Sequence, residues 1–547
     1  MAFSELKSDS AGNQALISPS LKDEWWELIV KEGFSALFDR YGENYKWFAT
    51  TTVMIGALSM ALSATIINVA LPSIMDDFNI TQDQVKWLAA GYFAAVCTTM
   101  LANSWAVEAL GLRATFMGAM TIFMMASVLG GFAPDKNILI LSRVAQGAMA
   151  GIIQPLSMII IFNVFPHNER GKGIGIFGLG VVLAPAFGPV IGGALIDIFS
   201  WRAVFFFALP FCTLGLIMSL IFLPSRRQQE QCPKFDWIGF VLLVIAVGSL
   251  MWTISNGYRL GWRSGSLLGI AGVGIATATG FILRQRRLTQ PMLDMSIYAS
   301  RNFAYGSVLS FVLGIALFGT TYLIPLFVQQ IQGLTASSTG LLLMPAGFVM
   351  AALLPFTGRL CDRISVYKPI IFGLLVIASS CFLMQRAEIS TNFFILALWI
   401  AIGRGGIALL MPAINTGALT SLEIAKVTRG AGPLNFARML GAAFGINILS
   451  ITLDQRTESH TNLIQERLIE ERAQLSYLTD GSEVLPVEIF AFDKLPVFDF
   501  SEVINQTIHV QAYTLAFHDA FTLLGIIFVI AIIPAWLMKK HVKPPIQ

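Results

Sequence analysis

The stretch Gly173-Ile-Gly-Ile-Phe-Gly-Leu-Gly-Val-Val-Leu-Ala-Pro-Ala-Phe-Gly-Pro-Val-Ile-Gly-Gly-Ala-Leu-Ile-Asp197 is long enough to cross a bilayer and carries no charge before its last residue. Its small residues recur every four positions and therefore form one smooth helix face: Gly180, Ala184, Gly188 and Gly192. Such a face lets a second helix approach closely in lipid. Pro185 and Pro189 each remove a backbone hydrogen bond and bend the helix. The stretch predicts a bendable, tightly packed seal between two halves of a membrane protein; ordinary glycine packing in a bundle is the alternative.

Composition places the whole chain in a membrane. Of its 547 residues, 55% are hydrophobic and only 13% are charged, where soluble proteins carry about 25% charged residues. The net charge of +3 indicates no nucleic-acid partner. The five cysteines form neither a CxxC site nor a disulfide framework, and no cleavable signal peptide is expected.

Apolar runs of the length that crosses about 30 Å of hydrocarbon predict fourteen transmembrane helices. The expected spans are 47–71, 85–106, 114–133, 137–163, 173–196, 202–223, 236–254, 265–283, 304–328, 336–357, 369–385, 392–415, 432–451 and 514–537. Basic residues concentrate in alternate connections, such as Arg226 with Arg227 and Arg284 with Arg287. By the positive-inside rule, both termini are then cytoplasmic.

Two segments outside the spans have their own predictions. Residues 20–44 read as an amphipathic helix that lies on the cytoplasmic membrane surface, or, alternatively, on the protein's own loops. Residues 452–513 read as a long loop on the opposite side, with a charged helical part, large enough for a helical hairpin or a partner contact.

A weak internal repeat relates two connections on the cytoplasmic side. Glu108 and Arg113 follow the second span, and Asp362 and Arg363 follow the tenth. Matching loops in two halves predict a pseudo-symmetric transporter with its pathway between the halves.

Arg143, early in the fourth span, is the clearest functional candidate. A charge in the membrane costs at least about 2.5–3.5 kcal/mol, so such residues usually face a cavity or a partner. An arginine holds an anion or lowers the pKa of a nearby acid, but does not usefully release its own proton. Snorkelling to the interface is the alternative; Gln146 and Gly147, one turn on, favour an interior position.

Further polar groups within apolar spans are candidates for lining a pathway. Thr65 and Asn68 share a helix face, where they either line the cavity or bond to a neighbouring helix. The other polar candidates are Tyr92, Gln154, Tyr322 and Gln329, and further charges lie at Arg404 and Arg438. No nucleotide-binding loop, metal-ligand cluster or catalytic set is present in the sequence, which predicts neither enzymatic activity nor a cofactor.

Taken in order, these motifs resemble those of the major facilitator superfamily, specifically the fourteen-helix drug:proton antiporters of the EmrB/QacA type. The resemblance covers about residues 46–540. It rests on Thr65 to Pro72, Trp87 to Tyr92, Glu108 to Arg113, Arg143 to Gly147, the antiporter motif around Gly188-Pro189-Val-Ile-Gly192-Gly193, Trp201-Arg202, Phe235 to Gly239 and Pro325 to Gln329.

The resemblance implies an all-α fold with two pseudo-symmetric six-helix bundles that rock to give alternating access. The expected divisions are a cytoplasmic tail (1–45), a first bundle (46–223), two extra helices with linkers (224–300) and a second bundle (301–547). It also implies that proton influx drives export of lipophilic compounds across a bacterial cytoplasmic membrane. Some relatives work with a periplasmic adaptor and an outer-membrane channel.

Two departures from the family pattern affect the chemistry. Ser63 stands where the family usually has an aspartate in the first helix, and the first cytoplasmic motif is degenerate, with Ser104, Glu108 and Ala109 at three of its positions. The acids that remain as proton carriers are Asp197, Asp519 and Glu108, each of which has a helix-end or interface role as its alternative.

The leading hypothesis is therefore a proton-coupled exporter of hydrophobic small molecules. The missing first-helix aspartate argues against a preference for cationic drugs and raises a second reading, the export of one metabolite such as a siderophore or fatty acid. A sensor or scaffold that does not transport is a third reading, which the retained pathway motifs disfavour.

Overall fold

The computed structural model describes residues 37–165, 180, 187–225, 235–288, 291–422, 424–479 and 500–538. Within these ranges, twelve helices are long and apolar enough to cross a membrane. The pair Gln82–Met100 and Asn103–Leu110, which bends by 55° at its break, makes a thirteenth when the two helices are taken as one span. The expected fifth span contributes the shorter helix Phe187–Ile198. Each of the fourteen predicted spans thus has a described helical counterpart, and the all-α prediction is confirmed.

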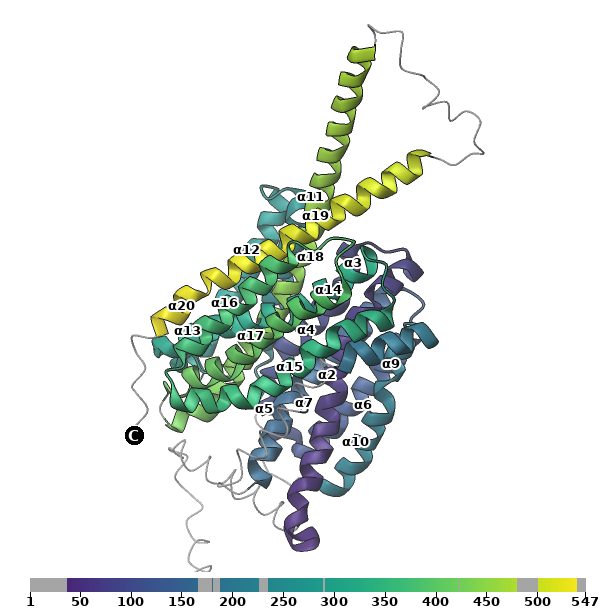
Figure 1. Cartoon of the computed structure of the whole chain (residues 1–547). Helices are drawn as coiled ribbons and strands as arrows, with labels where there is room; N and C mark the ends of the chain where they lie inside the picture. Colours follow the sequence, from purple (N-terminus) through teal and green to yellow (C-terminus); the bar gives the residue numbers. More distant parts are fainter. Residues whose placement is uncertain are drawn as a thin grey trace, which may run out of the picture.

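The helices form two halves and an extra pair (Figure 1). The first half contains α2 (Tyr45–Phe78), α3 (Gln82–Val85), α4 (Trp87–Met100), α5 (Asn103–Leu110), α6 (Leu112–Gly131), α7 (Lys136–Val164), Phe187–Ile198, α9 (Ala203–Phe206) and α10 (Ala208–Phe222). The extra pair is α11 (Trp237–Leu260) and α12 (Gly265–Arg287). The short helix η2 (Met295–Ala299) then leads into the second half.

The second half begins with α13 (Arg301–Gly314), the π-helical segment η3 (Ile315–Gly319) and α14 (Thr320–Gln330), which together make one span. It continues with α15 (Ala336–Arg363), α16 (Tyr367–Met384), α17 (Phe393–Leu419), α18 (Ile424–Thr479), α19 (Phe500–Ile530) and α20 (Ile532–Met538). We call the end of the bundle where α2 ends and α15 begins the distal end, and the opposite end the proximal end. The chain enters α2 at the proximal end, and Met538 lies there too, against Gly417.

Glycines bring paired helices together inside each half. A Cβ atom on Gly147 of α7 would lie 2.2 Å from the carbonyl oxygen of Tyr92, and one on Gly151 would lie 2.4 Å from that of Val96. In the second half, a Cβ on Gly441 would lie 2.0 Å from the carbonyl oxygen of Phe311. Only glycine allows these backbones to approach so closely, as expected where packing drives helix association.

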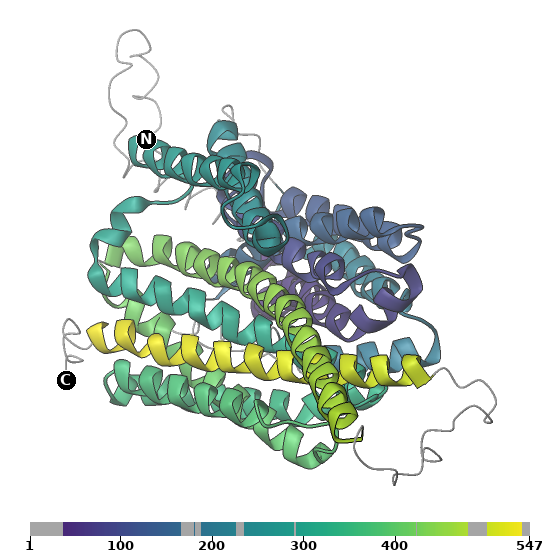
Figure 2. The ribbon, with the colours of Figure 1, turned by 90° about the horizontal axis from the view of Figure 1, so that it is seen from above.

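The α11–α12 pair lies beside the boundary between the halves (Figure 2). It contacts both, through α4 of the first half and α18 of the second. Large apolar side chains are exposed on the outward faces of many helices, as lipid contact requires, including Ile217, Val244, Ile275, Phe372, Phe394 and Leu398.

The helical part predicted within the loop 452–513 is longer than expected, and the predicted end of the thirteenth span at residue 451 does not end its helix. α18 runs without a break from Ile424 to Thr479, and α19 begins at Phe500. Both helices extend past the distal end of the bundle (Figure 1). The prediction ended the span where hydrophobicity falls, but charged residues with good helix propensity continue a helix beyond the membrane. The predicted amphipathic helix 20–44 falls mostly outside the described residues.

Candidate functional site between the two halves

A cavity lies between the halves, midway along the bundle. The first half lines it from α2, α4 and α7, and the second half from the α13–η3 span, α15, α17 and α18. Three predicted pathway residues line it, namely Thr65, Tyr92 and Gln154. Most of the other lining side chains are apolar, and they include Met60, Phe93, Phe318, Met350, Met411 and Met439. Such a flexible, polarisable wall suits lipophilic ligands of varied shape.

Arg143 stands behind the cavity wall. Its guanidinium is buried and stacks on the ring of Tyr92, with 4.4 Å from Cζ to the ring centroid. Nε donates to the carbonyl oxygen of Leu88 at 3.1 Å, and Nη1 donates to Ser63 Oγ at 3.1 Å and to Gln146 Oε1 at 2.7 Å. Nη2 has no hydrogen-bond partner among the residues that the structure describes. Arg143 is therefore in contact with a residue that lines the cavity, Tyr92, through a cation–π interaction. The Tyr92 hydroxyl donates to the carbonyl oxygen of Met60.

Gln146 fixes this arrangement from the far side. Its side chain is fully buried, and Nε2 donates to Ser127 Oγ of α6 at 2.8 Å. The amide oxygen is therefore directed at Arg143. Asn68 is also buried, but its amide oxygen and nitrogen both lack partners in the described structure. An unpaired buried amide is costly, so Asn68 is poised to bond to a group that the described residues do not supply.

Two more buried arginines come from the second half. Arg438 lines the cavity and donates to Asn435 Oδ1. Arg404 donates to Thr321 Oγ1 at 2.6 Å and to the carbonyl oxygen of Leu317, a cavity-lining residue, at 3.3 Å. Sequence reasoning noted both charges but did not place them in the site, because a position within an apolar span does not reveal which face meets the other half.

The cavity and the residues behind its wall carry positive charge. Among the described lining residues, Arg438 is the one charged side chain. The described hydrogen-bond partners of Arg143, Arg404 and Arg438 are hydroxyl, amide and carbonyl oxygens, with no carboxylate among them. A buried cation without a counter-ion is costly, and a bound anion would relieve that cost.

The glycine stripe packs against the first helix of its own half. A Cβ atom on Gly188 would lie 2.3 Å from Thr65 Oγ1, one on Gly192 would lie 2.8 Å from Ile66 Cγ2, and one on Gly180 would lie 3.1 Å from Met54 Sδ. The interpretation of this stripe as packed against the opposite bundle is therefore corrected. Pro185 lies outside the described residues.

The opposite bundle meets other residues of the same helix. A Cβ atom on Gly193 would lie 2.2 Å from the carbonyl oxygen of Ala336 in α15, and one on Gly340 would lie 2.5 Å from that of Pro189. The helix Phe187–Ile198 therefore presents two smooth faces. One face packs against α2, and the other packs against α15 at the distal end.

The remaining polar candidates lie outside the cavity. Gln329 Nε2 donates to the carbonyl oxygen of Val69 at 3.1 Å, which joins the two halves. Tyr322 belongs to a distal polar network and accepts a hydrogen bond from Gln82. Asp519 pairs with His460 and Arg456 where α18 meets α19.

The other gating candidates lie at the proximal end of the bundle. Arg113 Nε donates to the carbonyl oxygen of Leu223 at 2.6 Å and so caps the C-terminal end of α10. Glu108 is exposed on α5, and Arg363 is exposed at the end of α15. The side chain of Asp362 lies outside the described residues.

Comparison with known proteins decides the family. Residues 53–446 match the sequence model of the Major Facilitator Superfamily. The chain belongs to this superfamily. Among its relatives, the multidrug transporter protein MdtP of Bacillus subtilis is 29% identical over 423 residues, which cover 77% of each chain. The colistin resistance protein EmrB of Acinetobacter baumannii is 26% identical over 496 residues, 89% of this chain and 95% of that protein.

The fold comparison agrees. The crystal structure of a bacterial homolog of the human lysosomal transporter Spinster superposes with a TM-score of 0.61 at 15% identity, and covers 91% of this chain and 99% of that one. The protein is thus a multi-span transporter of the Major Facilitator Superfamily, and its curated relatives place it at family level among drug exporters.

Proposed function

We propose that this transporter exports lipophilic small molecules by proton-coupled antiport. The single observation that carries the proposal is the cavity between the halves, which is lined mainly by apolar side chains from both. A site at the interface of two packed halves is alternately exposed when the halves rock. The distal end is the proposed outer face of a bacterial cytoplasmic membrane, with both termini on the inner side.

The charge balance of the cavity refines the substrate class. Arg438 faces the cavity, and Arg143 acts through Tyr92. Ser63 leaves the first helix without the carboxylate that would attract a cation. We therefore expect neutral and anionic lipophiles to bind better than cations, because the cavity is electropositive and poorly solvated.

Two ions of similar size and shape test this selectivity. Tetraphenylborate and tetraphenylphosphonium differ in charge, and their binding to the purified protein can be measured by calorimetry. The borate is expected to bind at least tenfold more tightly, and Arg438→Gln is expected to remove most of that difference. Arg386→Ala, an exposed arginine after α16, is the control. Tighter binding of the phosphonium would contradict the substrate class.

Transport itself is tested in proteoliposomes with an imposed pH gradient. A lipophilic weakly acidic drug and a neutral drug are both expected to be moved against their gradients, and transport should stop when an ionophore collapses the proton gradient. Unchanged transport after that collapse would refute proton coupling while leaving transport established.

A second candidate function is export of one lipophilic carboxylate, such as a fatty acid or a siderophore. The observation that favours it is Arg438 as the one charge among the described lining residues, which suits a ligand with an apolar body and one acidic group. Comparison of the secreted metabolites and the drug susceptibility of a deletion strain separates the candidates. Loss of one secreted compound with unchanged susceptibility would favour the metabolite.

The distal extension of α18 and α19 is the proposed contact for a periplasmic adaptor, which would join the transporter to an outer-membrane channel. Its support is the length of helix that projects past the bundle (Figure 1). Replacing residues 462–506 with a short linker is expected to abolish drug resistance in cells and leave transport in proteoliposomes intact. Full resistance of cells with the shortened protein would exclude this role.

A further inference from the structure

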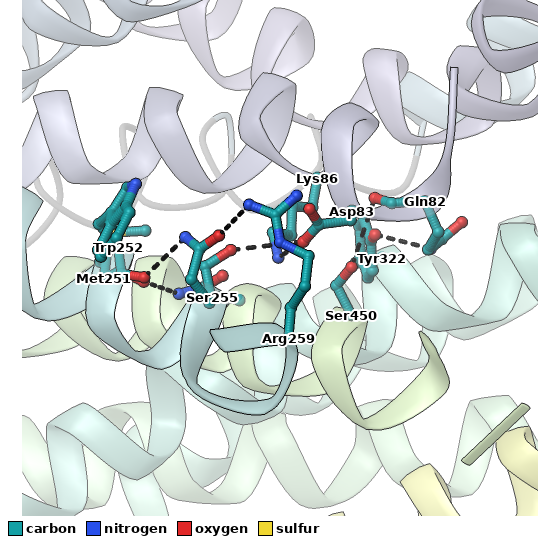
Figure 3. Close-up of polar contacts among 11 residues, drawn as sticks. Gln82, Asp83, Lys86, Met251, Trp252, Ser255, Arg259, Tyr322 and Ser450 are labelled. Atoms are coloured by element: carbon teal, nitrogen blue, oxygen red, sulfur yellow. Dashed lines mark hydrogen bonds and ion pairs between the residues drawn. The ribbon is translucent and has the colours of Figure 1, made fainter. Parts of the chain in front are cut away.

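The short helix α3 lies where both halves and the extra pair meet at the distal end (Figure 3). Gln82 Nε2 donates to Tyr322 Oη of α14 at 2.8 Å, and Ser450 Oγ of α18 donates to the carbonyl oxygen of Gln82 at 3.5 Å. Ser255 Oγ of α11 donates to Asp83 Oδ1 at 3.4 Å. One turn of the first half is therefore bonded to the second half and to the extra pair at once.

This junction contains an ammonium group and two carboxylates. Lys86 has no exposed side-chain surface and forms an ion pair with Asp83, whose side chain is 40% exposed. Asp454 lies one turn beyond Ser450 on α18, within electrostatic range of both Lys86 and Asp83. Lys86 carries one positive charge and the two acids carry two negative charges, so these three side chains have a net charge of −1 when both acids are ionised.

Further titratable and charged groups surround the cluster, and Lys136 of α7 reaches α3 by donating to Gln84 Oε1 at 2.8 Å. Tyr322 of α14 and Tyr513 of α19 interact electrostatically with Asp454, and both are neutral phenols near neutral pH. Arg259 of α11 donates to Asn256 Oδ1 at 2.7 Å. Further out, Arg456 and His460 of α18 pair with Asp519 of α19.

Like charges at close range disfavour the state in which both carboxylates are ionised, so two acids beside one cation can take up a proton. We propose that Asp83, Lys86 and Asp454 form the proton-binding site that couples this transporter to the proton gradient. The inference rests on the proposed antiport. The first half supplies Asp83 and Lys86 to this cluster, and the second half supplies Asp454.

The location of the cluster makes its protonation depend on conformation. Gln82 and Ser450 are 368 residues apart and belong to opposite halves, so opening the distal end moves Asp454 away from Asp83 and Lys86. A proton from the distal medium then binds one carboxylate, and closure brings the three side chains together with no net charge. Tyr322 lies one turn beyond Phe318, a cavity-lining residue, so the proton leaves through the cavity when the proximal end opens.

The acids expected from the sequence have other contacts. Asp197 caps α15 through the backbone N–H of Ser337, and Asp519 pairs with His460 and Arg456. Glu108 is exposed on α5. Asp83 and Asp454 lie instead where the two halves meet at the distal end.

The test compares two kinds of transport by the full chain in proteoliposomes. Substrate exchange without a pH gradient needs no net proton movement, whereas gradient-driven uptake does. Asp454→Asn and Asp83→Asn are expected to keep exchange within about threefold of wild type and to lose at least tenfold of gradient-driven uptake. Asp76→Asn, at an exposed carboxylate near the distal end of α2, is the control, and it should retain both activities.

A second measurement reads the proton directly. Substrate addition to weakly buffered wild-type protein should release protons to a pH indicator, and Asp454→Asn should release far fewer. Asp454→Glu, which keeps the carboxylate, should restore both proton release and gradient-driven uptake, and this rescue distinguishes a proton site from a structural contact.

Three outcomes would overturn the assignment. Asparagine variants that remain fully gradient-driven exclude these acids as the proton site. Loss of exchange together with uptake, with proton release unchanged, shows that the cluster is only a latch. A wild-type protein that exchanges substrate but never responds to the pH gradient refutes the proposed proton coupling itself, and the assignment with it.

Discussion

Asp197, at the end of helix Phe187–Ile198 in the first half, accepts a hydrogen bond of 3.0 Å from the backbone N–H of Ser337 in the second half. Ser337 lies in the first turn of α15, where backbone N–H groups lack partners within the helix. The carboxylate therefore caps a helix of the opposite bundle and favours the closed distal end.

Removing this cap should favour the distal-open state. Asp197→Ala is expected to shift the equilibrium by about fivefold, since an N-terminal cap contributes about 1 kcal/mol. Val190→Cys, opposite Gly340, reports opening through its reaction rate with a membrane-impermeant maleimide in a background without native cysteines. An unchanged rate would show that the interhalf hydrogen bond does not stabilise closure.

Gly193 and Gly188 should differ in their tolerance of a methyl group. Gly193→Ala meets the backbone of Ala336, which cannot rotate away, and is expected to reduce transport at least tenfold. Gly188→Ala meets the Thr65 side chain and should lose less activity, whereas Gly188→Leu should block transport. Gly269→Ala, with open space around it, is the control. Equal losses at Gly193 and Gly269 would refute the close approach as the cause.

Arg143→Ala should abolish transport without unfolding the protein. The substitution removes the cation from the face of Tyr92 and leaves Gln146 Oε1 without its donor. Arg143→Lys should restore little, because a single ammonium group cannot reproduce the planar set of bonds to Leu88, Ser63 and Gln146. Transport rates and monodisperse elution check both expectations; export at the wild-type rate by either variant would remove Arg143 from the mechanism.

Ser63→Asp should change the charge preference of the cavity. The new carboxylate would lie beside Arg143, whose Nη1 is 3.1 Å from Ser63 Oγ, and would neutralise its field. Tetraphenylphosphonium should then bind at least tenfold more tightly and tetraphenylborate more weakly, as measured by calorimetry. Ser63→Asn, of similar size and uncharged, is the control and should leave the preference unchanged.

Asp236 should make the extra helix pair sensitive to acid. Burial alone would raise the pKa of Asp236, but hydrogen bonds from the Gly239 N–H, Arg284 and Gln285 hold it below its usual range. A lowered pKa means that this stabilisation is complete above the usual aspartate pKa of about 4 and is lost as the pH falls through the folded-state pKa.

Asp236→Asn is therefore expected to destabilise the protein at pH 7 by about 1–3 kcal/mol, the cost of leaving hydrogen-bonded partners unsatisfied. The difference in thermal unfolding between variant and wild type should shrink in acid. Asp294→Asn, which alters only the cap on Ser296, is the control. A difference that grows as the pH falls would contradict the sign of the pKa shift.

Much of the architecture could be predicted because its causes are local. The length of each apolar run predicted the spans, and glycine spacing predicted where backbones approach closely. Arg143 was predicted to lie in the interior because a membrane charge needs a polar environment. The boundary at residue 452 was wrong, since hydrophobicity marks where the membrane ends and not where a helix ends.

Sequence by itself determined the membrane class, the span pattern and a glycine-rich helix with small residues on its faces. Only tertiary structure decided what those faces touch, with Gly188 against α2 and Gly193 against α15. It alone placed Asp454 of α18 beside the local Asp83–Lys86 pair. The physical reason is that hydropathy and helical spacing belong to neighbouring residues, whereas a shared charge or cavity arises only when packing brings distant helices together.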